Sequence, residues 1–136
     1  DSVAEALNLA PEERQRPAQA LPSGGLADVL AMVDGDRSLA AEVLQEYLDR
    51  SPSLLADIDQ ALESWDHKTL GRYAHTLKGS LLTLGFQDAG EGARRLEQAA
   101  RKGQRQDCGV IVAQLHRDLA QVDAMILDFL AAAEEG

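Results

Sequence analysis

An uninterrupted helical pattern is the feature that most restricts how this chain can fold. Apolar residues recur every three or four positions from Leu26 to about residue 133, and no segment alternates apolar and polar residues as a half-buried strand does. The pattern predicts a short helix over 26–33 and four longer ones over 37–63, 67–84, 88–102 and 106–133. Because the connections between the long helices are short, neighbouring helices should run antiparallel. We therefore expect an all-α fold, an antiparallel four-helix bundle with a short additional N-terminal helix.

The composition agrees with close packing of helices. Hydrophobic residues make up 45% of the 136 residues but aromatic residues only 4%, so the core must consist mainly of Leu, Ala, Val and Ile. A chain of this length fits one domain. Residues 1–25 differ from the rest, because prolines and the pair Gly24-Gly25 interrupt any long periodicity. We interpret 1–25 as a linker or accessory segment and 26–133 as the bundle.

Local signals indicate where the long helices end and which side they bury. Asp66 and Asp88 are placed to cap the helices over 67–84 and 88–102, and Gly85 is placed to end the former. Ser51-Pro52 favours a kink or a break in the 37–63 helix. The predicted inner face of that helix consists of Leu39, Val43, Leu44, Tyr47, Leu48, Leu54, Leu55, Ile58 and Leu62. The predicted inner face of the last helix consists of Val110, Val112, Leu115, Leu119, Val122, Met125, Ile126 and Phe129.

Charge and cysteine content restrict the classes of partner and site. A formal net charge of −10 repels nucleic acid and anionic membrane surfaces, so we expect protein partners. Cys108 is the only cysteine, which excludes an internal disulfide, and no Cys/His cluster has the spacing of a zinc site. No apolar run has transmembrane length and no signal-peptide pattern is present. These features favour a reducing, cytoplasmic setting, and Asp1 as first residue favours a fragment of a longer protein.

Residues 74–86, AHTLKGSLLTLGF, combine a leucine stripe with a histidine, a lysine and a glycine. On a helical projection at ~100° per residue, a sector of roughly 80° contains Leu70, Ala74, Leu77, Leu81 and Leu84, which marks the core side. His75 lies about 140° from the centre of that sector, so its imidazole is predicted to face solvent or a partner. The outward stripe within about 60° of His75 consists of Gly71, Lys78, Gly79, Leu82 and Phe86.

The neighbours of His75 suit a phosphoryl acceptor that is reached by a partner. Gly79, one turn later, removes a side chain that would crowd the ring, although glycine costs about 1 kcal/mol of helix propensity relative to alanine. Lys78, three residues after the histidine, can offset the negative charge of a phosphoryl group. Leu82 and Phe86 add apolar surface that a partner could cover. The pattern therefore predicts a phosphoacceptor histidine within a docking surface.

These residues resemble the histidine phosphotransfer (HPt) domain of bacterial multistep phosphorelays. The run His75-Thr76-Leu77-Lys78-Gly79-Ser80, followed by Leu84-Gly85, is similar to the family motif H-x-L-K-G-[SA] and its L-G pair. Leu96-Glu97 with Ala100-Arg101-Lys102-Gly103 is similar to its L-E-x-x-A-R-x-G, and Gly35-Asp36, Leu44 and Tyr47-Leu48 to its G-D…L…F-L pattern. The resemblance covers about residues 26–130. Phe86, Ala89 and Ala93 depart from commoner residues, and Gly90 and Gly92 weaken the predicted start of the fourth long helix.

The resemblance implies a four-helix bundle in which His75 accepts a phosphoryl group from a receiver-domain aspartate and passes it to another receiver. It implies no kinase machinery in the domain, a charge-balancing role for Lys78 and an access role for Gly79. It also implies that Gln87 hydrogen-bonds near the phosphohistidine. We expect no metal or cofactor in the domain, with Mg²⁺ only in the partner receiver.

The expected partners are receiver domains of response regulators or of a hybrid sensor histidine kinase, from which the chain itself could derive. The expected docking residues around the histidine are Gly71, Leu82, Phe86 and Gln87. We expect the domain to be a monomer that neither binds nucleic acid nor inserts into a membrane.

Other classes of function remain open at this point. A plain helical adaptor would explain the leucine stripes but not the glycine and lysine beside His75. The dimerisation domain of a histidine kinase would carry an acidic residue directly after the histidine, where this chain has Thr76. A metal-binding bundle would carry Glu-x-x-His motifs, but Arg72 and Ala113 occupy the positions three residues before His75 and His116.

Several further polar residues receive less specific interpretations. We expect His67 to be solvated in the first turn of its helix and His116 to lie at the surface. Arg94, Arg95 and Arg101 form a basic cluster in an acidic chain, which is either a solvated face or a contact for an acidic receiver surface.

Overall fold

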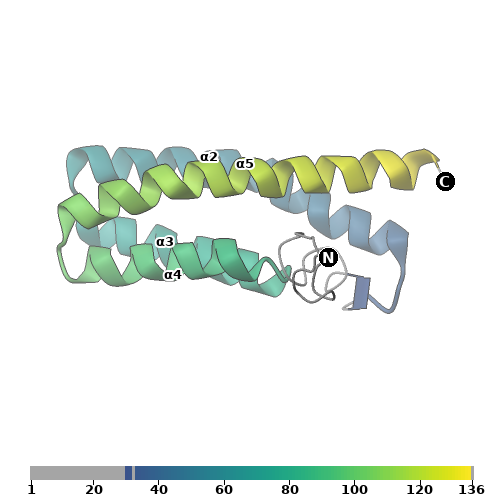
Figure 1. The fold of residues 1–136 in the computed structure, drawn as a ribbon, viewed down its shortest axis with the longest axis horizontal. Coiled ribbons are helices and arrows are strands. Elements are labelled where there is room, and N and C mark those ends of the chain that lie inside the picture. The colour runs from purple at the N-terminus through teal and green to yellow at the C-terminus, as the bar shows by residue number, and fades with distance from the viewer. Residues whose placement is uncertain (1–29, 32, 136) are drawn as a thin grey trace, which may run out of the picture.

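Four long helices make up most of the described chain. The computed structural model describes residues 30–31 and 33–135, with α2 (Arg37–Ser64), α3 (His67–Thr83), α4 (Gln87–Arg101) and α5 (Arg105–Glu135) (Figure 1). Each helix begins and ends within two residues of its predicted bounds. Of the predicted short helix over 26–33, Leu30 and Ala31 are helical. Residues 26–29 and 32 lie outside the described part, as does the predicted linker over 1–25.

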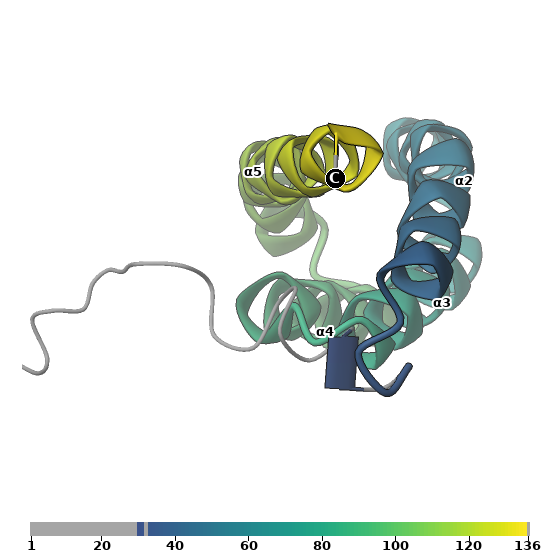
Figure 2. The same cartoon turned by 90° about the vertical axis from the view of Figure 1, so that its right-hand side faces the viewer.

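The four helices form a closed ring in which direct neighbours run in opposite directions. Figure 2, a view along the bundle, shows α2, α3, α4 and α5 in this order around a common centre, and each packs on the next, with α5 also on α2. α2 and α5 are the longer helices and extend past the α3–α4 pair at one end (Figure 1). α2 also continues unbroken through Pro52. The prediction of an all-α antiparallel bundle is confirmed.

Within the described chain, side-chain caps are present at the start of α2 and of α3, the second of which was predicted, but not at the start of α4. The Asp36 carboxylate accepts a hydrogen bond from the Leu39 backbone N–H at 3.1 Å, and that of Asp66 accepts one from Thr69 at 3.2 Å, which caps α2 and α3. The predicted Asp88 cap is wrong. α4 begins after Phe86, and in the described structure that residue provides no side-chain cap. Asp88 instead lies in the first turn, where its charge is favourable to the helix dipole.

The turn between α3 and α4 explains why Phe86 is not on the surface. Gly85 adopts φ +85°, and the backbone N–H groups of Gly85 and Phe86 donate to the carbonyls of Leu82 and Leu81. This pair of bonds is a Schellman motif, in which the residue after the glycine turns back onto the helix. Phe86 is fully buried as a result. The helical projection placed it outward because it continued the helix past Gly85, and that prediction is wrong.

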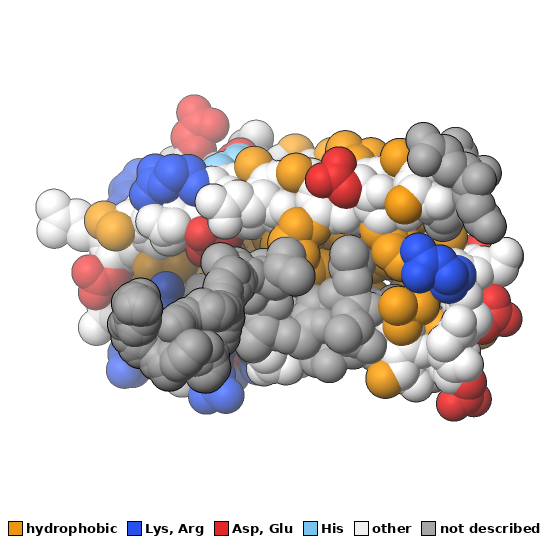
Figure 3. Space-filling view, turned by 45° about the vertical axis from the view of Figure 1, so that its right-hand side comes forward, with side chains coloured by type: hydrophobic (Ala, Val, Ile, Leu, Met, Phe, Trp, Pro, Cys, Tyr) orange, Lys and Arg blue, Asp and Glu red, His pale blue; other side chains and the backbone are white. Residues whose placement is uncertain are grey.

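The core follows one side of each helix, with two errors in the predicted inner faces. The fully buried side chains include Leu44 and Ile58 of α2, Leu70, Leu77 and Leu81 of α3, Leu96 of α4, and Cys108, Leu115, Leu119 and Ile126 of α5. Leu39 is 43% exposed and Val110 is 71% exposed, against prediction. Cys108 and Val112 both face the core, and Val110 lies about 200° from each, so it points away. In Figure 3, hydrophobic side chains are visible along the upper and right-hand parts of the face.

Candidate functional site

His75 lies near the middle of α3 with its ring at the surface, as predicted. Its side chain is 62% exposed. The residues predicted to lie behind it, Leu70, Ala74, Leu77, Leu81 and Leu84, are all buried. The core therefore holds α3 in the rotation that presents the imidazole outward.

The hydrogen-bond partner of His75 is a residue that the sequence analysis did not assign to the site. Glu97 projects from α4, 22 residues further along the chain, and its Oε2 lies 3.1 Å from His75 Nδ1. The Glu97 side chain is only 8% exposed. Burial by itself would raise the pKa of Glu97, but hydrogen bonds from Lys78 and His75 and the charges of Lys78 and Arg101 outweigh it and lower the pKa.

The ionised state of Glu97 determines which nitrogen of His75 carries a proton. A carboxylate only accepts hydrogen bonds, so Nδ1 of the ring must be the donor. In a neutral imidazole, Nε2 is then the unprotonated nitrogen with a free lone pair. Nε2 is on the opposite side of the five-membered ring from the contact with Glu97. The geometry therefore leaves a nucleophilic nitrogen directed away from α4.

Two cations complete the cluster around Glu97. Lys78 Nζ lies 2.9 Å from Oε1, and Arg101 Nη2 lies 2.6 Å from Oε2. The lysine side chain is 24% exposed. Lys78 was predicted to lie beside His75, and it does, although in this structure its ammonium is bound to the same carboxylate as the ring. Its role in balancing phosphoryl charge stays a prediction.

Gly79 provides open space next to His75. Among the described residues, no heavy atom beyond its own helix turn and chain neighbours lies within 4 Å of the position that a Cβ on Gly79 would occupy. The packing of the bundle therefore does not require glycine here.

Gly90 of α4 differs, because a Cβ there would lie 2.5 Å from Leu82 Cδ2. Gly90 was predicted to weaken the start of α4. In the structure it allows α3 and α4 to pack closely against each other.

The predicted docking residues are distributed differently from expectation. Leu82 is 36% exposed and Gln87 is exposed, but Phe86 and Gly71 are buried, so these two are not part of an open face. Along α3, Gly71, His75 and Leu82 lie opposite Arg101, Glu97 and Gly90 of α4. This register places Gln87 level with Gly85, about 15 Å along the axis from His75. Glu97 is therefore the residue in contact with the ring, and the register argues against the hydrogen bond implied for Gln87.

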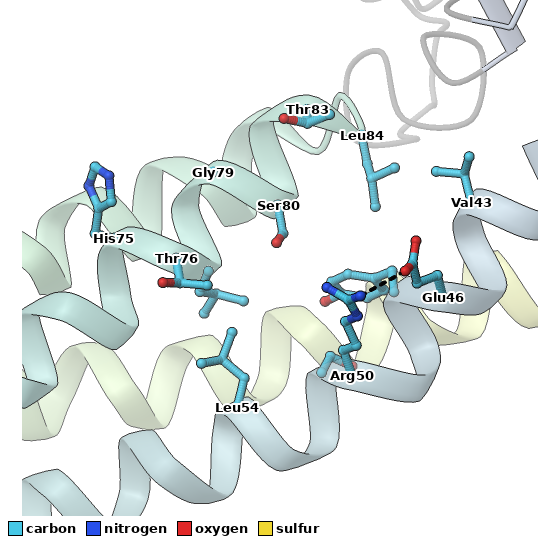
Figure 4. Close-up of a pocket in the computed structure, with 13 residues that line it drawn as sticks. Val43, Glu46, Arg50, Leu54, His75, Thr76, Gly79, Ser80, Thr83 and Leu84 are labelled. Atoms are coloured by element: carbon cyan, nitrogen blue, oxygen red, sulfur yellow. Dashed lines mark ion pairs between the residues drawn. The ribbon is translucent and has the colours of Figure 1, made fainter.

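A groove runs along α3 from His75 towards the end of the helix. It has a volume of about 470 Å³ and lies between α2 and α3. Figure 4 shows His75 at one end and Thr83 and Leu84 at the other, with Thr76, Gly79 and Ser80 between them. On the opposite wall, α2 contributes Val43 and Leu54 and the ion pair between Glu46 and Arg50, at 2.9 Å (Figure 4). The groove is thus apolar in part, with polar groups along its edges.

The other histidines have structural partners. His67 was predicted to be solvated, but it is half-buried, with Nδ1 3.1 Å from the Ala100 carbonyl and its ring 5.5 Å from that of Trp65. His116 is at the surface as predicted, and its Nε2 lies 2.9 Å from Asp59. The described residues contain no cluster of side chains that could hold a metal ion. Among the helices described, none is long and apolar enough to cross a membrane.

A protein-family model described as the Hpt domain matches residues 42–125, a range that contains His75, Lys78, Glu97 and Arg101. No curated protein and no solved structure matches the chain.

Proposed function

The chain belongs to the Hpt family, whose domains transfer phosphoryl groups through a histidine in phosphorelays, and on that premise we propose that His75 is the phosphoacceptor. Hpt domains perform this transfer without a kinase catalytic domain, and they interact with receiver domains. The observation that carries the proposal is the contact between His75 Nδ1 and Glu97, because it leaves Nε2 free at the surface.

The chemistry proposed for His75 is a direct displacement at phosphorus. The Nε2 lone pair attacks the phosphorus of a receiver's aspartyl phosphate, an N–P bond forms, and the P–O bond to the aspartate breaks to release a carboxylate. Nδ1 keeps its proton, so the ring gains a positive charge that the Glu97 carboxylate stabilises. In the second half of the relay, an aspartate of another receiver attacks the phosphorus and the electron pair of the N–P bond returns to Nε2.

The surroundings of His75 support docking of a receiver at this face. Gly79 leaves space beside the ring, and the groove between α2 and α3 begins at His75. The domain supplies a positioned nucleophile and a surface, and we propose that the receiver supplies its own acidic pocket with Mg²⁺. We also propose that the domain is a monomer without a cofactor, that it acts in the cytoplasm, and that its receivers belong to response regulators or a hybrid sensor kinase.

The test compares two exposed histidines that are each bound to a carboxylate. The protein is treated with phosphoramidate, a small phosphoryl donor that needs no partner, and separately with a receiver domain phosphorylated by acetyl phosphate. His75→Gln should abolish the acid-labile, base-stable phosphorylation that marks phosphohistidine. His116→Gln, which removes the ring paired with Asp59, should leave this phosphorylation unchanged. Both variants should retain the helical circular dichroism of the parent. Phosphohistidine on the His75→Gln variant would refute the assignment.

A further inference from the structure

Arg101 lies at the end of α4, and its side chain reaches Glu97 one turn earlier on the same helix, next to the phosphoacceptor site. A Cβ on Gly71 would lie 3.7 Å from Arg101 Cγ, an ordinary van der Waals distance, so the arginine stem packs directly beside Gly71. The guanidinium then reaches Glu97, where Nη2 lies 2.6 Å from Oε2. This is the oxygen that also accepts the hydrogen bond from His75 Nδ1. Gly71, which was expected to serve docking, is buried next to this side chain.

The Glu97 carboxylate is held at both oxygens by cations from different helices. Lys78 of α3 binds Oε1, and Arg101 of α4 binds Oε2. If Lys78 were the only cation, it would hold Glu97 by Oε1. The other oxygen, Oε2, which lies next to the His75 ring, would then have no charged partner. Arg101 counteracts that pull, because an ionised hydrogen bond at Oε2 is roughly twice as strong as a neutral one.

We propose that Arg101 is a positioning residue for phosphoryl transfer, which fixes Glu97 Oε2 against His75 Nδ1 and thereby keeps the Nε2 lone pair directed outward. The inference rests on the proposed role of His75. Arg101 does not need to touch the phosphoryl group for this role. Arg94, on the same helix, does not share the role, because its ion pair is with Glu91. A loosened Glu97 would let the imidazole exchange between its two tautomers, and the tautomer with a proton on Nε2 cannot attack phosphorus.

The test uses Arg101→Gln, the conservative Arg101→Lys and the matched control Arg94→Gln, which removes one charge from the same helix but one whose ion pair is with Glu91. Nitrogen-15 NMR of the His75 ring should show a proton fixed on Nδ1 in the parent protein. In Arg101→Gln the signals of the two ring nitrogens should move towards each other, as expected when tautomers mix. Arg101→Lys should restore most of the parent spectrum, and Arg94→Gln should not differ from the parent.

The rate of phosphorylation by phosphoramidate provides a second readout that is independent of docking. It should fall about tenfold in Arg101→Gln and remain close to the parent rate in Arg94→Gln. With a phosphorylated receiver as donor, the loss should appear in kcat and not in KM. An unchanged ring spectrum and rate in Arg101→Gln would overturn the inference, as would a loss confined to KM and shared with Arg94→Gln, which would identify Arg101 as a docking charge. If the parent protein takes no phosphoryl group on His75, the proposed function fails, while the NMR comparison still decides whether Arg101 controls the ring.

Discussion

Glu97 is the residue at which three side chains from two helices meet. A buried carboxylate is stable only when hydrogen bonds and opposite charges compensate its lost hydration, and His75, Lys78 and Arg101 provide that compensation. The sequence contains a signal for this arrangement, because Glu97 lies on the same stripe of α4 as the buried Ala93 and Ala100. A charged residue on an apolar stripe needs partners, but which residues supply them depends on the register of α3 against α4.

The access role of Gly79 can be separated from its effect on stability. Gly79→Ala should raise the free energy of unfolding by about 1 kcal/mol, because helix propensity improves and the structure has room for the Cβ. Gly79→Gln should also fold, and it should react with phosphoramidate at nearly the parent rate. Its rate with a phosphorylated receiver should be much lower, because the longer side chain obstructs the partner. Denaturant unfolding and the two phosphorylation assays measure these effects, and equal receiver-dependent rates in all three proteins would contradict an access role.

At the scale of the helix, the sequence predicts periodicity well and chain reversals poorly. The leucine stripe correctly orients α3 and exposes His75, since α3 is regular from the Asp66 cap to Thr83. Phe86 follows a glycine of positive φ, where a helical projection no longer applies. The same limit applies to Gln87, because its distance from His75 depends on how the turn sets α4 against α3. Val110 was misplaced for a simpler reason, namely that it cannot share a helix face with Val112.

The contact between α2 and α5 contains two buried polar groups, one on Asp123 and one on Tyr47. Asp123 Oδ1 and Tyr47 Oη are buried, and in the part of the chain that the structure describes neither has a hydrogen-bond partner. Burial raises the pKa of Asp123, and burial together with the nearby Asp123 raises that of Tyr47. The folded state therefore disfavours the ionised carboxylate, which is the opposite of the situation at Glu97.

Replacement of Asp123 by a neutral residue of the same shape should stabilise the bundle in a pH-dependent way. Because the pKa of Asp123 is raised in the folded protein, ionisation opposes folding above the usual pKa of 3.8, and this penalty disappears as the pH falls and the group becomes protonated. Asp123→Asn should therefore raise Tm at pH 7, and the gain should shrink towards pH 3. Asp128→Asn, at an exposed position of α5, is the matched control and should show no such trend. A lower Tm at pH 7 for Asp123→Asn would contradict this account.

At the scale of the whole molecule, the net charge of −10 conceals a strong separation of charge. Residues 67–105, which span α3, α4 and the turns beside them, contain eight Lys or Arg and three Asp or Glu, a net charge of +5. Residues 34–66 contain nine acidic and two basic residues, and residues 106–135 contain six and one, for net charges of −7 and −5. The basic half carries His75. An acidic partner is therefore attracted to the side of the molecule on which the reactive ring lies.

This separation predicts how the reaction responds to salt. Raising NaCl from about 0.05 M to 0.5 M shortens the Debye length from more than 10 Å to less than 5 Å, so attraction to the basic half should weaken. The kcat/KM for a phosphorylated receiver should fall severalfold, through KM, whereas the phosphoramidate rate should change little. The double variant Arg94→Glu, Arg95→Glu should have a higher KM at low salt and a weaker salt dependence. A receiver reaction that accelerates with salt would show that the charge separation does not guide the encounter.

The reactive nitrogen of His75 has one open side, because Glu97 occupies the other side of the ring. Under the proposed function, donor and acceptor receivers must reach the same atom through the same approach, so they exclude each other. The relay then follows a ping-pong cycle with two separate half-reactions, and the loaded domain has to dissociate from the first protein before it meets the second. Unloaded acceptor competes with the donor for every free domain. The relative abundance of phosphorylated donor and free acceptor thus influences the speed of phosphate flow.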